Sequence, residues 1–547
     1  MKVVIVGGVA GGMSAATRLR RLNEKAEIIV LEKSGFVSYA NCGLPYYVGG
    51  VIEKESELLL QTPESLHQRF RLDVRVLNEV TAIDSSKKEV HVKNLISGED
   101  YSLPYDKLIL SPGASPVRPP IPGIDRALTL RTVEDVERIH RFVEKKPENA
   151  IVIGGGFIGL EMAENLSHKG IKTTVVEALD QVLAPLDSEM AYQVTQELRR
   201  HGVDVYLSNS VARIDSAEVE LSDGQRLKAD FVVAAIGVRP DVKLAESAGL
   251  KIGSRGGIYV DEHNLTSNPD IYAIGDAAEK FDALDGSATL VPLANIANRH
   301  GRVVADHIEK RTTRSVETIG TAIVKVFDLT IAVTGWNEKK LKATQRIYSA
   351  IHTHPNSHAG YYPGAKQMTI KLLFDPMSGE IFGAQAIGSE GVDKRIDVIA
   401  TAMRGKLTAP ELADLELAYA PPFGSAKDPI NMLGYVAENI VLGVEKTAQW
   451  NQVNEYIEAG YELIDVRTPD EFAAGSIPGA INIPVDEIRL RTSEISTKKV
   501  LVTCQVGMRG HTAAMLLKGL GFDAVNLDGG YQLWSNSPAA HELQRVN

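Results

Sequence analysis

Two segments of this 547-residue chain repeat the same order of strand, glycine-rich turn and helix, and the repeat restricts the possible folds. Residues 2–22 read KVVIVGGVAGGMSAATRLRRL, and Glu32 follows the turn by about 20 residues. Residues 150–178 read AIVIGGGFIGLEMAENLSHKGIKTTVVEA and end beside Glu177. Such glycines let a dinucleotide pyrophosphate approach a helix N-terminus, while the acidic residue binds ribose hydroxyls. We therefore expect an α/β protein with two Rossmann-like dinucleotide-binding domains.

The two turns differ in detail. The second has Gly154, Gly156 and Gly159 in full register, and a carboxylate at Glu177 would repel a 2′-phosphate, so this turn favours NADH over NADPH. The first has Val9 where the middle glycine is expected. Taken alone, either segment could be an ordinary tight turn and Glu177 could merely end a strand; the repetition favours two nucleotide sites.

Composition narrows the functional classes. A chain of this length divides on average into roughly three or four domains. The formal net charge of -11 argues against a general nucleic-acid binder, and no apolar run approaches the roughly 18 residues that a membrane span needs. The two cysteines, Cys42 and Cys504, cannot make a disulfide framework, so we expect a reducing cytoplasm and catalytic roles for both. No metal site is predicted.

Cys42 lies in SYANCGLPYYVGG, residues 38–50, which has the pattern of a loop that leads into a helix. Amide groups and the helix dipole could hold its thiol as thiolate. Many disulfide-reducing flavoenzymes have a second cysteine at the position of Tyr47. Without one, the oxidised form of Cys42 must be a mixed disulfide, a persulfide or a sulfenic acid. A buried structural cysteine is the alternative.

A later segment, TSNPDIYAIGDAAE at residues 266–279, resembles the second flavin motif of flavoproteins with two dinucleotide-binding domains, in which an Asp bonds the ribityl chain of FAD. The resemblance implies an FAD-binding domain of residues 1–112 and 236–318 around an NADH-binding domain of residues 113–235. An α+β dimerisation domain, residues 319–443, and a C-terminal α/β domain, residues 447–547, would follow. The expected cofactor-binding residues are Gly7, Gly8, Ala10, Gly11, Gly12, Glu32, Lys33, Gly113, Gly154, Gly156, Gly159, Glu177, Gly237, Gly275 and Asp276.

Six motifs together resemble one known family over essentially the whole chain. They are VGGVAGG, SYANCGLPYYVGG, LILSPGASPVRPPIPG, HAGYYPGA, GVDKRID and LAYAPPFGSAKDPINM. The family is that of the coenzyme A disulfide reductases, in its rhodanese-fused branch of NADH-dependent persulfide and polysulfide reductases. The cysteine loop is shared with single-cysteine NADH peroxidases and oxidases, so this loop does not distinguish the activities.

Other positions separate these relatives. The peroxidases and oxidases have a histidine that assists peroxide chemistry where this chain has Ala10. The disulfide reductases bring two tyrosines of the partner subunit toward the cysteine, and Tyr361 and Tyr419 match them. A phenol can supply a proton to a departing thiolate. The resemblance thus implies a homodimer, although Tyr361 and Tyr419 could instead be aromatic core residues.

A basic pair could hold the phosphates of coenzyme A. Arg18 and Arg21 are three residues apart on the expected first helix and share a face, which could instead be merely solvated. The family resemblance adds further residues to this pocket, namely Ser14, Ser38, Asn41, Asn298 and Lys427.

Cys504 ends an apolar strand, and a short loop leads from it to Arg509 and an amphipathic helix. Successive amides in such a loop can hold an anion such as a persulfide. With ELIDVRTPDEFAAGSIPGAINIP before it and NLDGGYQLW after it, the segment resembles a single rhodanese domain. Related phosphatases have one more residue between cysteine and arginine, so bound sulfane sulfur fits this loop better than phosphate. An inactive rhodanese relative is the alternative.

These observations predict a homodimeric FAD enzyme that uses NADH to reduce the sulfur–sulfur bond of CoA persulfide, polysulfide or CoA disulfide. Cys42, Tyr361, Tyr419, Cys504 and Arg509 are the expected catalytic residues. An NADH oxidase or peroxidase that cycles through a sulfenic acid is one alternative. A redox sensor or sulfur carrier with little turnover is another.

Overall fold

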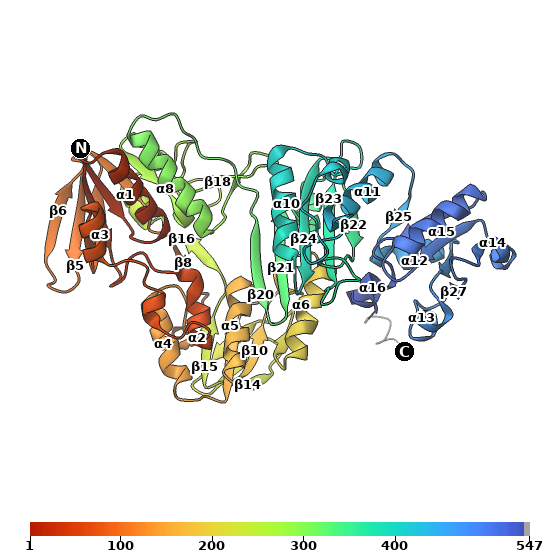
Figure 1. The fold of residues 1–547 in the computed structure, drawn as a ribbon. Coiled ribbons are helices and arrows are strands. Elements are labelled where there is room, and N and C mark those ends of the chain that lie inside the picture. The colour runs from red at the N-terminus through yellow and green to blue at the C-terminus, as the bar shows by residue number, and fades with distance from the viewer. Residues whose placement is uncertain (541–547) are drawn as a thin grey trace. The chain divides into compact units, whose positions relative to one another are not determined.

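The computed structural model describes residues 1–540 and divides into two compact units. The first unit comprises Met1–Asp180 and Gly202–Ile319, and the second comprises Gln181–His201 with the chain from Gly320 onward (Figure 1). Parallel sheets and flanking helices confirm the predicted mixed α/β fold. Within the described range, no helix has both the length and the apolar character needed to cross a membrane.

A five-stranded parallel sheet forms the first half of the first unit. Its strands in spatial order are β17 (Ile271–Ala273), β7 (Lys107–Leu110), β1 (Lys2–Val6), β2 (Glu27–Glu32) and β3 (Asp73–Val76). The strands other than the edge strand β3 are mostly apolar because both faces of a parallel sheet are covered; Val3, Val4 and Ile5 have no exposed surface. Helices α1 (Ala10–Leu22) and α8 (Ala294–Ile308) pack against each other. Further elements of this half are η1 (Asn41–Gly43), α2 (Leu44–Gly49), α3 (Pro63–Phe70), α7 (Lys243–Ser247), η4 (Gly275–Ala277), β18 (Lys280–Phe281), β19 (Ala288–Thr289) and an antiparallel sheet of β4 (Asn78–Asp84), β5 (Glu89–Asn94) and β6 (Asp100–Pro104).

A second parallel sheet is inserted between the parts of the first. Its spatial order is β11 (Asp204–Tyr206), β10 (Lys172–Val176), β9 (Asn149–Ile153) and β15 (Phe231–Ala234). The chain enters and leaves the insertion through an antiparallel pair of short strands, β8 (Ala114–Pro116) and β16 (Val238–Pro240). The insertion also contains α4 (Val133–Val143), α5 (Phe157–His168) and an antiparallel sheet of β12 (Val211–Ile214), β13 (Glu218–Leu221) and β14 (Arg226–Lys228).

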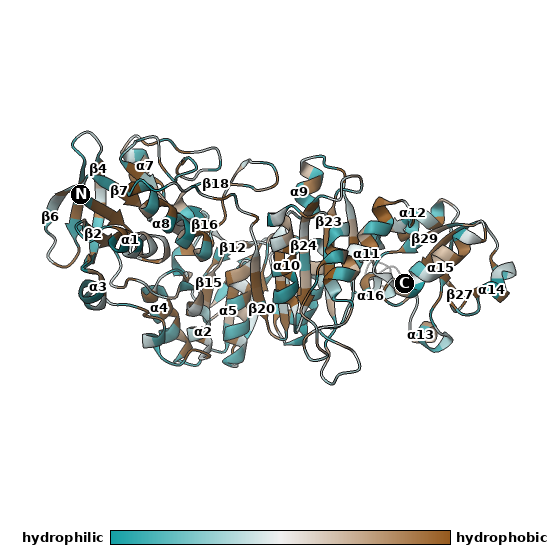
Figure 2. Ribbon diagram, turned by 45° about the horizontal axis from the view of Figure 1, so that its top comes forward, coloured by the Kyte–Doolittle hydropathy of each residue, from teal (hydrophilic) through white to brown (hydrophobic). Residues whose placement is uncertain are grey.

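The second unit contains one antiparallel and one parallel sheet. The antiparallel sheet has the order β20 (Ala322–Val326), β21 (Leu329–Gly335), β24 (Ile381–Gly388), β23 (Met368–Phe374) and β22 (Ser349–Thr353). Every residue of β23 and β24 is buried. Figure 2 shows the hydrophobic character of the edge strand β20, which pairs with β21. The accompanying helices are α6 (Ser188–Arg200), α9 (Glu338–Ala343), α10 (Val392–Gly405) and α11 (Pro429–Val441).

The parallel sheet of the second unit carries Cys504. Its order is β25 (Thr447–Ala448), β29 (Asp523–Leu527), β28 (Lys499–Thr503), β26 (Glu462–Asp465) and β27 (Ile481–Asn482). The remaining elements of this segment are η6 (Trp450–Gln452), α12 (Val453–Glu458), α13 (Pro469–Ala473), α14 (Ile488–Arg491), η7 (Thr492–Glu494), α15 (Met508–Gly519) and α16 (Gly530–Ser535). Cys504 therefore follows the central strand, at the carboxyl edge where α/β folds place ligands.

Candidate active sites

The first glycine turn is closed by contacts that leave no room for side chains. Gly7 has a φ of +99°, and a Cβ there would lie 2.1 Å from the carbonyl oxygen of Ser111. A Cβ on Gly12 would lie 1.9 Å from the carbonyl oxygen of Gly7. One on Gly11 would lie 3.2 Å from Ile274. The turn therefore joins the carboxyl ends of β1, β7 and β17 in one place, where Ala10 begins α1.

Glu32 lies at the mouth of this turn as a buried carboxylate. Its oxygens accept hydrogen bonds from the backbone N–H groups of Gly8 (2.7 Å) and Ser34 (2.8 Å). Burial raises the pKa of Glu32 despite these bonds. Each carboxylate oxygen retains a free lone pair, so ribose hydroxyls could donate to it and relieve its desolvation. These residues fit the adenosine half of FAD.

The Gly275–Asp276 motif lies in η4, and a guanidinium and an ammonium fix its geometry. Arg131 donates to Asp276 Oδ2 (2.8 Å). Lys280 Nζ donates to the carbonyl oxygens of Gly275 (2.6 Å) and Ala278 (3.0 Å), and burial lowers the pKa of Lys280 to about 8. A Cβ on Gly113, whose φ is +75°, would lie 3.1 Å from Arg131 Nη2. Sequence analysis missed Arg131 and Lys280 because no local pattern connects them to Asp276.

The second glycine turn has the same construction. A Cβ on Gly159 would lie 2.0 Å from the carbonyl oxygen of Gly154, whereas one on Gly156 would meet no atom within 4 Å. Glu177 accepts hydrogen bonds from the N–H groups of Gly155 (2.6 Å) and Leu179 (2.8 Å). Gly156 is thus open toward the space that a dinucleotide would need. Two other predicted residues lie outside this turn: Gly237 has a φ of +102°, and Lys33 pairs with Asp241 at 3.8 Å.

Cys42 has an exposed thiol within η1, and α2 follows it directly. The Ser38 N–H donates to the Gly8 carbonyl oxygen (2.8 Å), which connects the start of the cysteine loop to the first glycine turn. Partial burial, followed by the nearby charge of Glu161, raises the pKa of the Cys42 thiol. This differs from the thiolate stabilisation that we expected, because desolvation and then the Glu161 carboxylate both disfavour the charged thiolate.

Glu161 on α5 is a titratable neighbour of Cys42 that sequence analysis missed. It accepts a hydrogen bond from the Tyr46 hydroxyl (3.3 Å). Burial raises the pKa of Glu161 to about 7. The carboxyl can therefore gain or lose a proton near neutral pH, which is the range that suits a general acid or base.

The predicted coenzyme A residues of the first unit are brought together only in part. Ser14 Oγ donates to Asn298 Oδ1 (2.8 Å) across 284 positions of the chain. Arg18 forms two hydrogen bonds to Asp306 Oδ1 (3.0 and 2.7 Å), so an acidic partner that sequence analysis missed offsets its charge. The side chain of Arg21 is exposed. Asn41 Oδ1 is buried without a hydrogen-bond partner, so this oxygen could accept a bond from a ligand.

Tyr361 and Tyr419 meet on the second unit. Their hydroxyl groups are 3.1 Å apart, and this hydrogen bond raises the pKa of Tyr361. Both rings are exposed, Tyr361 by 76%, so they are not core residues. Tyr362 instead packs edge-on against His358, with ring centroids 5.6 Å apart. Lys427 Nζ lies 5.9 Å from the ring centroid of Tyr435.

The Cys504 loop encloses its sulfur between β28 and α15. The side chain is buried, and the Gly507 N–H donates to Sγ (3.1 Å). Arg509 donates two hydrogen bonds to Glu471 (2.8 and 2.7 Å). This bonding lowers the pKa of Glu471 to about 2. Arg467, which sequence analysis missed, donates to Gln505 (3.2 Å) and thus contacts the loop directly.

Comparison with family models divides the chain into three matched segments. Residues 1–301 match the model described as pyridine nucleotide-disulphide oxidoreductase, and residues 321–428 match its dimerisation domain. Residues 449–537 match the rhodanese-like domain. The predicted order of an oxidoreductase, a dimerisation segment and a rhodanese segment is confirmed.

Individual relatives agree with this assignment. The coenzyme A disulfide reductase of Staphylococcus aureus is 37% identical over 440 residues, which cover 80% of this chain and all of that protein. The structure of reduced Bacillus anthracis CoADR-RHD is 50% identical with a TM-score of 0.96 and covers 98% of both chains. That of a NAD-dependent persulfide reductase from A. fulgidus is 37% identical with a TM-score of 0.92 and covers 98% of this chain and 100% of the other. The predicted resemblance to rhodanese-fused coenzyme A disulfide reductases is confirmed.

Proposed function

Because this chain belongs to the pyridine nucleotide-disulphide oxidoreductase family, we propose that it is an FAD-dependent enzyme that uses NADH to reduce sulfur–sulfur bonds of CoA persulfide, polysulfide or CoA disulfide. The exposed thiol of Cys42 is the observation that carries this proposal. It lies in a loop bonded to a dinucleotide-type turn, and the only other cysteine is buried in the rhodanese segment. A lone thiol can reduce a sulfur–sulfur bond if the substrate supplies the second sulfur.

The Cys42 thiolate attacks the substrate and breaks its sulfur–sulfur bond. With CoA persulfide, either hydrosulfide leaves and Cys42 is joined to CoA, or CoA thiolate leaves and Cys42 becomes a persulfide. FAD, when bound, would pass the two electrons of NADH to this adduct. Reduction of the adduct restores the Cys42 thiolate and releases CoA in the first case and hydrogen sulfide in the second. The balance is NADH, one proton and CoA persulfide in, and NAD⁺, CoA and hydrogen sulfide out.

The chain's own residues would supply the protons. Tyr361 and Tyr419 share one hydrogen bond, so one hydroxyl proton of the pair remains available for a departing thiolate. The match to a dimerisation domain and the exposed aromatic rings of Tyr361, Tyr419 and Phe423 support a homodimer in which this pair serves the partner's Cys42. Ser14, Arg18, Arg21, Ser38, Asn41, Asn298 and Lys427 would bind coenzyme A.

The rhodanese segment would carry sulfane sulfur on Cys504. The Gly507 amide already donates to Sγ, and amides of a loop that begins a helix stabilise anions such as a persulfide. The Arg509–Glu471 pair joins the start of α15 to α13.

Glu177 supports NADH as the electron donor, because its carboxylate would repel a 2′-phosphate. Two free thiols suit a reducing cytoplasm.

Anaerobic NADH oxidation by the purified enzyme tests the proposal. Wild type, Cys42→Ser and Cys504→Ser would each receive CoA persulfide, CoA disulfide and hydrogen peroxide in separate assays. We expect Cys42→Ser to abolish turnover with both CoA compounds, and Cys504→Ser to abolish sulfur transfer from thiosulfate while NADH oxidation persists. A preference for persulfide of about tenfold, or 1.4 kcal/mol in transition-state energy, would identify a sulfane-sulfur reductase. Equal turnover with peroxide would favour an oxidase or peroxidase instead, and negligible turnover with every substrate would favour a sensor or sulfur carrier.

A further inference from the structure

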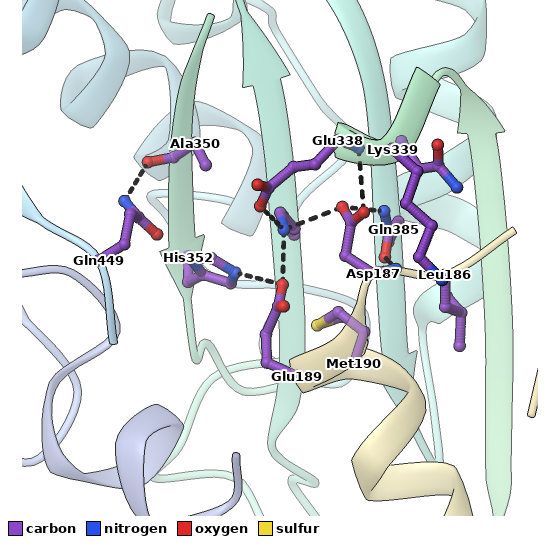
Figure 3. A network of polar contacts seen from close by, with 12 residues as sticks. Leu186, Asp187, Glu189, Met190, Glu338, Lys339, Ala350, His352, Gln385 and Gln449 are labelled. Carbon is purple, nitrogen blue, oxygen red and sulfur yellow. Dashed lines mark hydrogen bonds and ion pairs between the residues drawn. The ribbon is translucent and has the colours of Figure 1, made fainter. Parts of the chain in front are cut away.

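A buried network of charges joins several segments of the second unit (Figure 3). Lys371 on β23 has no exposed side-chain surface, and its ammonium contacts Asp187 (2.9 Å), Glu189 (2.5 Å) and Glu338 (2.5 Å). The ammonium occupies the space among the three carboxylates. Burying this many charges is costly unless each is paired, so the positions of the paired segments are restricted.

His352 on β22 extends this network into the rhodanese segment. One ring nitrogen, Nε2, lies 3.2 Å from Glu189, and the other, Nδ1, lies 2.5 Å from Asp528. The backbone N–H of His352 also donates to the second oxygen of Asp528 (3.0 Å). Burial acts to lower the pKa of His352, but the charge of Asp528 and the two hydrogen bonds together raise it to about 9. The imidazole is therefore a cation at neutral pH between two carboxylates, and Lys371 and the uncharged His354 are its other titratable neighbours.

Asp528 directly precedes the turn that supports the Cys504 loop. Gly529 and Gly530 have φ values of +67° and +61°, and a Cβ on Gly530 would lie 2.4 Å from the Cys504 carbonyl oxygen. The next two N–H groups, of Tyr531 and Gln532, donate to the carbonyl oxygens of Cys504 (2.7 Å) and Gln505 (2.9 Å). The backbone after Asp528 thus fixes the carbonyls of the same loop whose amides face the sulfur.

Neutral contacts also hold the same junction between the antiparallel sheet and the rhodanese segment. Gln449, just before η6, donates to the carbonyl oxygen of Ala350 on β22 (2.8 Å). Gln532 on α16 donates to Gln367 (2.8 Å). The His352–Asp528 pair is the charged and fully buried part of this junction, and it lies nearest in sequence to the turn that supports the loop.

We infer that His352 and Asp528 are positioning residues for sulfur transfer at Cys504, through which the dimerisation sheet holds the rhodanese loop in its active geometry. The inference rests on the proposed role of Cys504 as sulfur carrier. If Asp528 loses its partner, the Gly529–Gly530 turn loses its anchor, and the carbonyls of Cys504 and Gln505 lose fixed donors. The amides around Sγ would then no longer converge on a persulfide, even though every loop residue is unchanged.

Asp528→Ala and Asp528→Asn in the full-length holoenzyme test this inference. We would measure kcat and KM for sulfur transfer from thiosulfate to cyanide, and NADH oxidation with CoA disulfide in the same preparations. Asp528→Ala should lower kcat for sulfur transfer at least about tenfold, because small displacements at a reacting group cost that much or more. KM for thiosulfate should change less, and NADH oxidation should persist. Asp528→Asn should retain most sulfur transfer, because its amide can still accept from the His352 N–H and bond the ring.

The reactivity of Cys504 provides a second readout. Iodoacetamide should alkylate Cys504 faster in Asp528→Ala than in wild type, with Cys42 as the internal reference in each sample. His352→Gln should act in the same direction as Asp528→Ala. His201→Gln, which alters a histidine stacked on Phe327 elsewhere in this unit, should change neither property.

The outcomes separate the two ideas. If Asp528→Ala and His352→Gln both transfer sulfur and undergo alkylation at Cys504 at the wild-type rates, the positioning role is overturned. A wild type that cannot transfer sulfur would refute the proposed function of Cys504, and the alkylation rates would still show whether the pair orders the loop. If Asp528→Ala fails to fold and loses NADH oxidation, His352→Gln decides the question by the same two measurements.

Discussion

The carboxylate of Glu161 affects the ionisation of the Cys42 thiol. Burial and then Glu161 raise the pKa of Cys42, and burial raises the pKa of Glu161 itself to about 7. Glu161→Gln removes the negative charge, so the pKa of Cys42 should fall. In a Cys504→Ser background, the pH midpoint for alkylation of Cys42 by iodoacetamide should therefore move to lower pH.

An exposed carboxylate provides the control for this experiment. Glu246→Gln on α7 should leave the midpoint where it is in the parent protein. A midpoint that stays fixed or rises in Glu161→Gln would contradict the pairing of Glu161 with Cys42.

Some residues of the sites could be predicted from the sequence, and others could not. Cys42, Cys504 and the turn glycines could be identified because local spacing defines a strand, a turn and a helix start. Their partners could not: Asp306 is 288 residues from Arg18, and Arg131 is 145 residues from Asp276. Only the folded sheet brings such groups together. Arg18 was correctly placed on a helix face, but its neutralising partner lies on another helix.

In the second glycine turn, Gly159 is needed for packing and Gly156 for ligand access. A Cβ on Gly159 would overlap the Gly154 carbonyl oxygen, so Gly159→Ala should lower the free energy of unfolding by roughly 1–3 kcal/mol. Gly156 has a φ of −79° and open space around it, so Gly156→Ala should fold normally but obstruct the pyrophosphate. We expect Gly156→Ala to raise KM for NADH with an unchanged thermal midpoint.

The two alanine variants serve as controls for each other. A Gly156→Ala enzyme with wild-type KM would contradict binding of the dinucleotide at this turn. Equal thermal midpoints for Gly159→Ala and wild type would contradict the packing argument.

Helices and strands were predictable where each buries a regular apolar pattern. Central parallel strands such as β1 and β9 appear as apolar runs, and the glycine turns mark where helices begin. The charged junctions between elements were not predictable. Helix α6 follows the NADH-type turn in sequence, but its Glu189 pairs with Lys371 on β23, 182 residues later. Polar residues in such positions look like solvated surface until the partner strand is known.

The proposed assembly makes a prediction about mixed dimers. If Tyr361 and Tyr419 serve the partner's Cys42, a dimer of one Cys42→Ser chain and one Tyr361→Phe/Tyr419→Phe chain contains one intact site. Its NADH oxidation with CoA disulfide should reach about half the wild-type rate per dimer, since one of two equivalent sites is complete. Differently tagged chains allow the mixed dimer to be purified and assayed.

The parent homodimers set the baseline for this measurement. Each should be far less active than the mixed dimer. A mixed dimer that is no faster than the double-phenylalanine homodimer would mean that the tyrosines act within their own chain.

The buried His352–Asp528 pair has a consequence for the evolution of the fusion between the reductase part of the chain and the rhodanese segment. The Staphylococcus aureus coenzyme A disulfide reductase is matched over its whole length by only 440 residues of this chain. A chain without the rhodanese segment has no Asp528, so His352 would lose the carboxylate that bonds its ring and its backbone N–H, and with it the reason to keep a histidine at this position. We therefore expect a histidine at the position of His352 in relatives that have the rhodanese segment, and other residues in relatives that lack it.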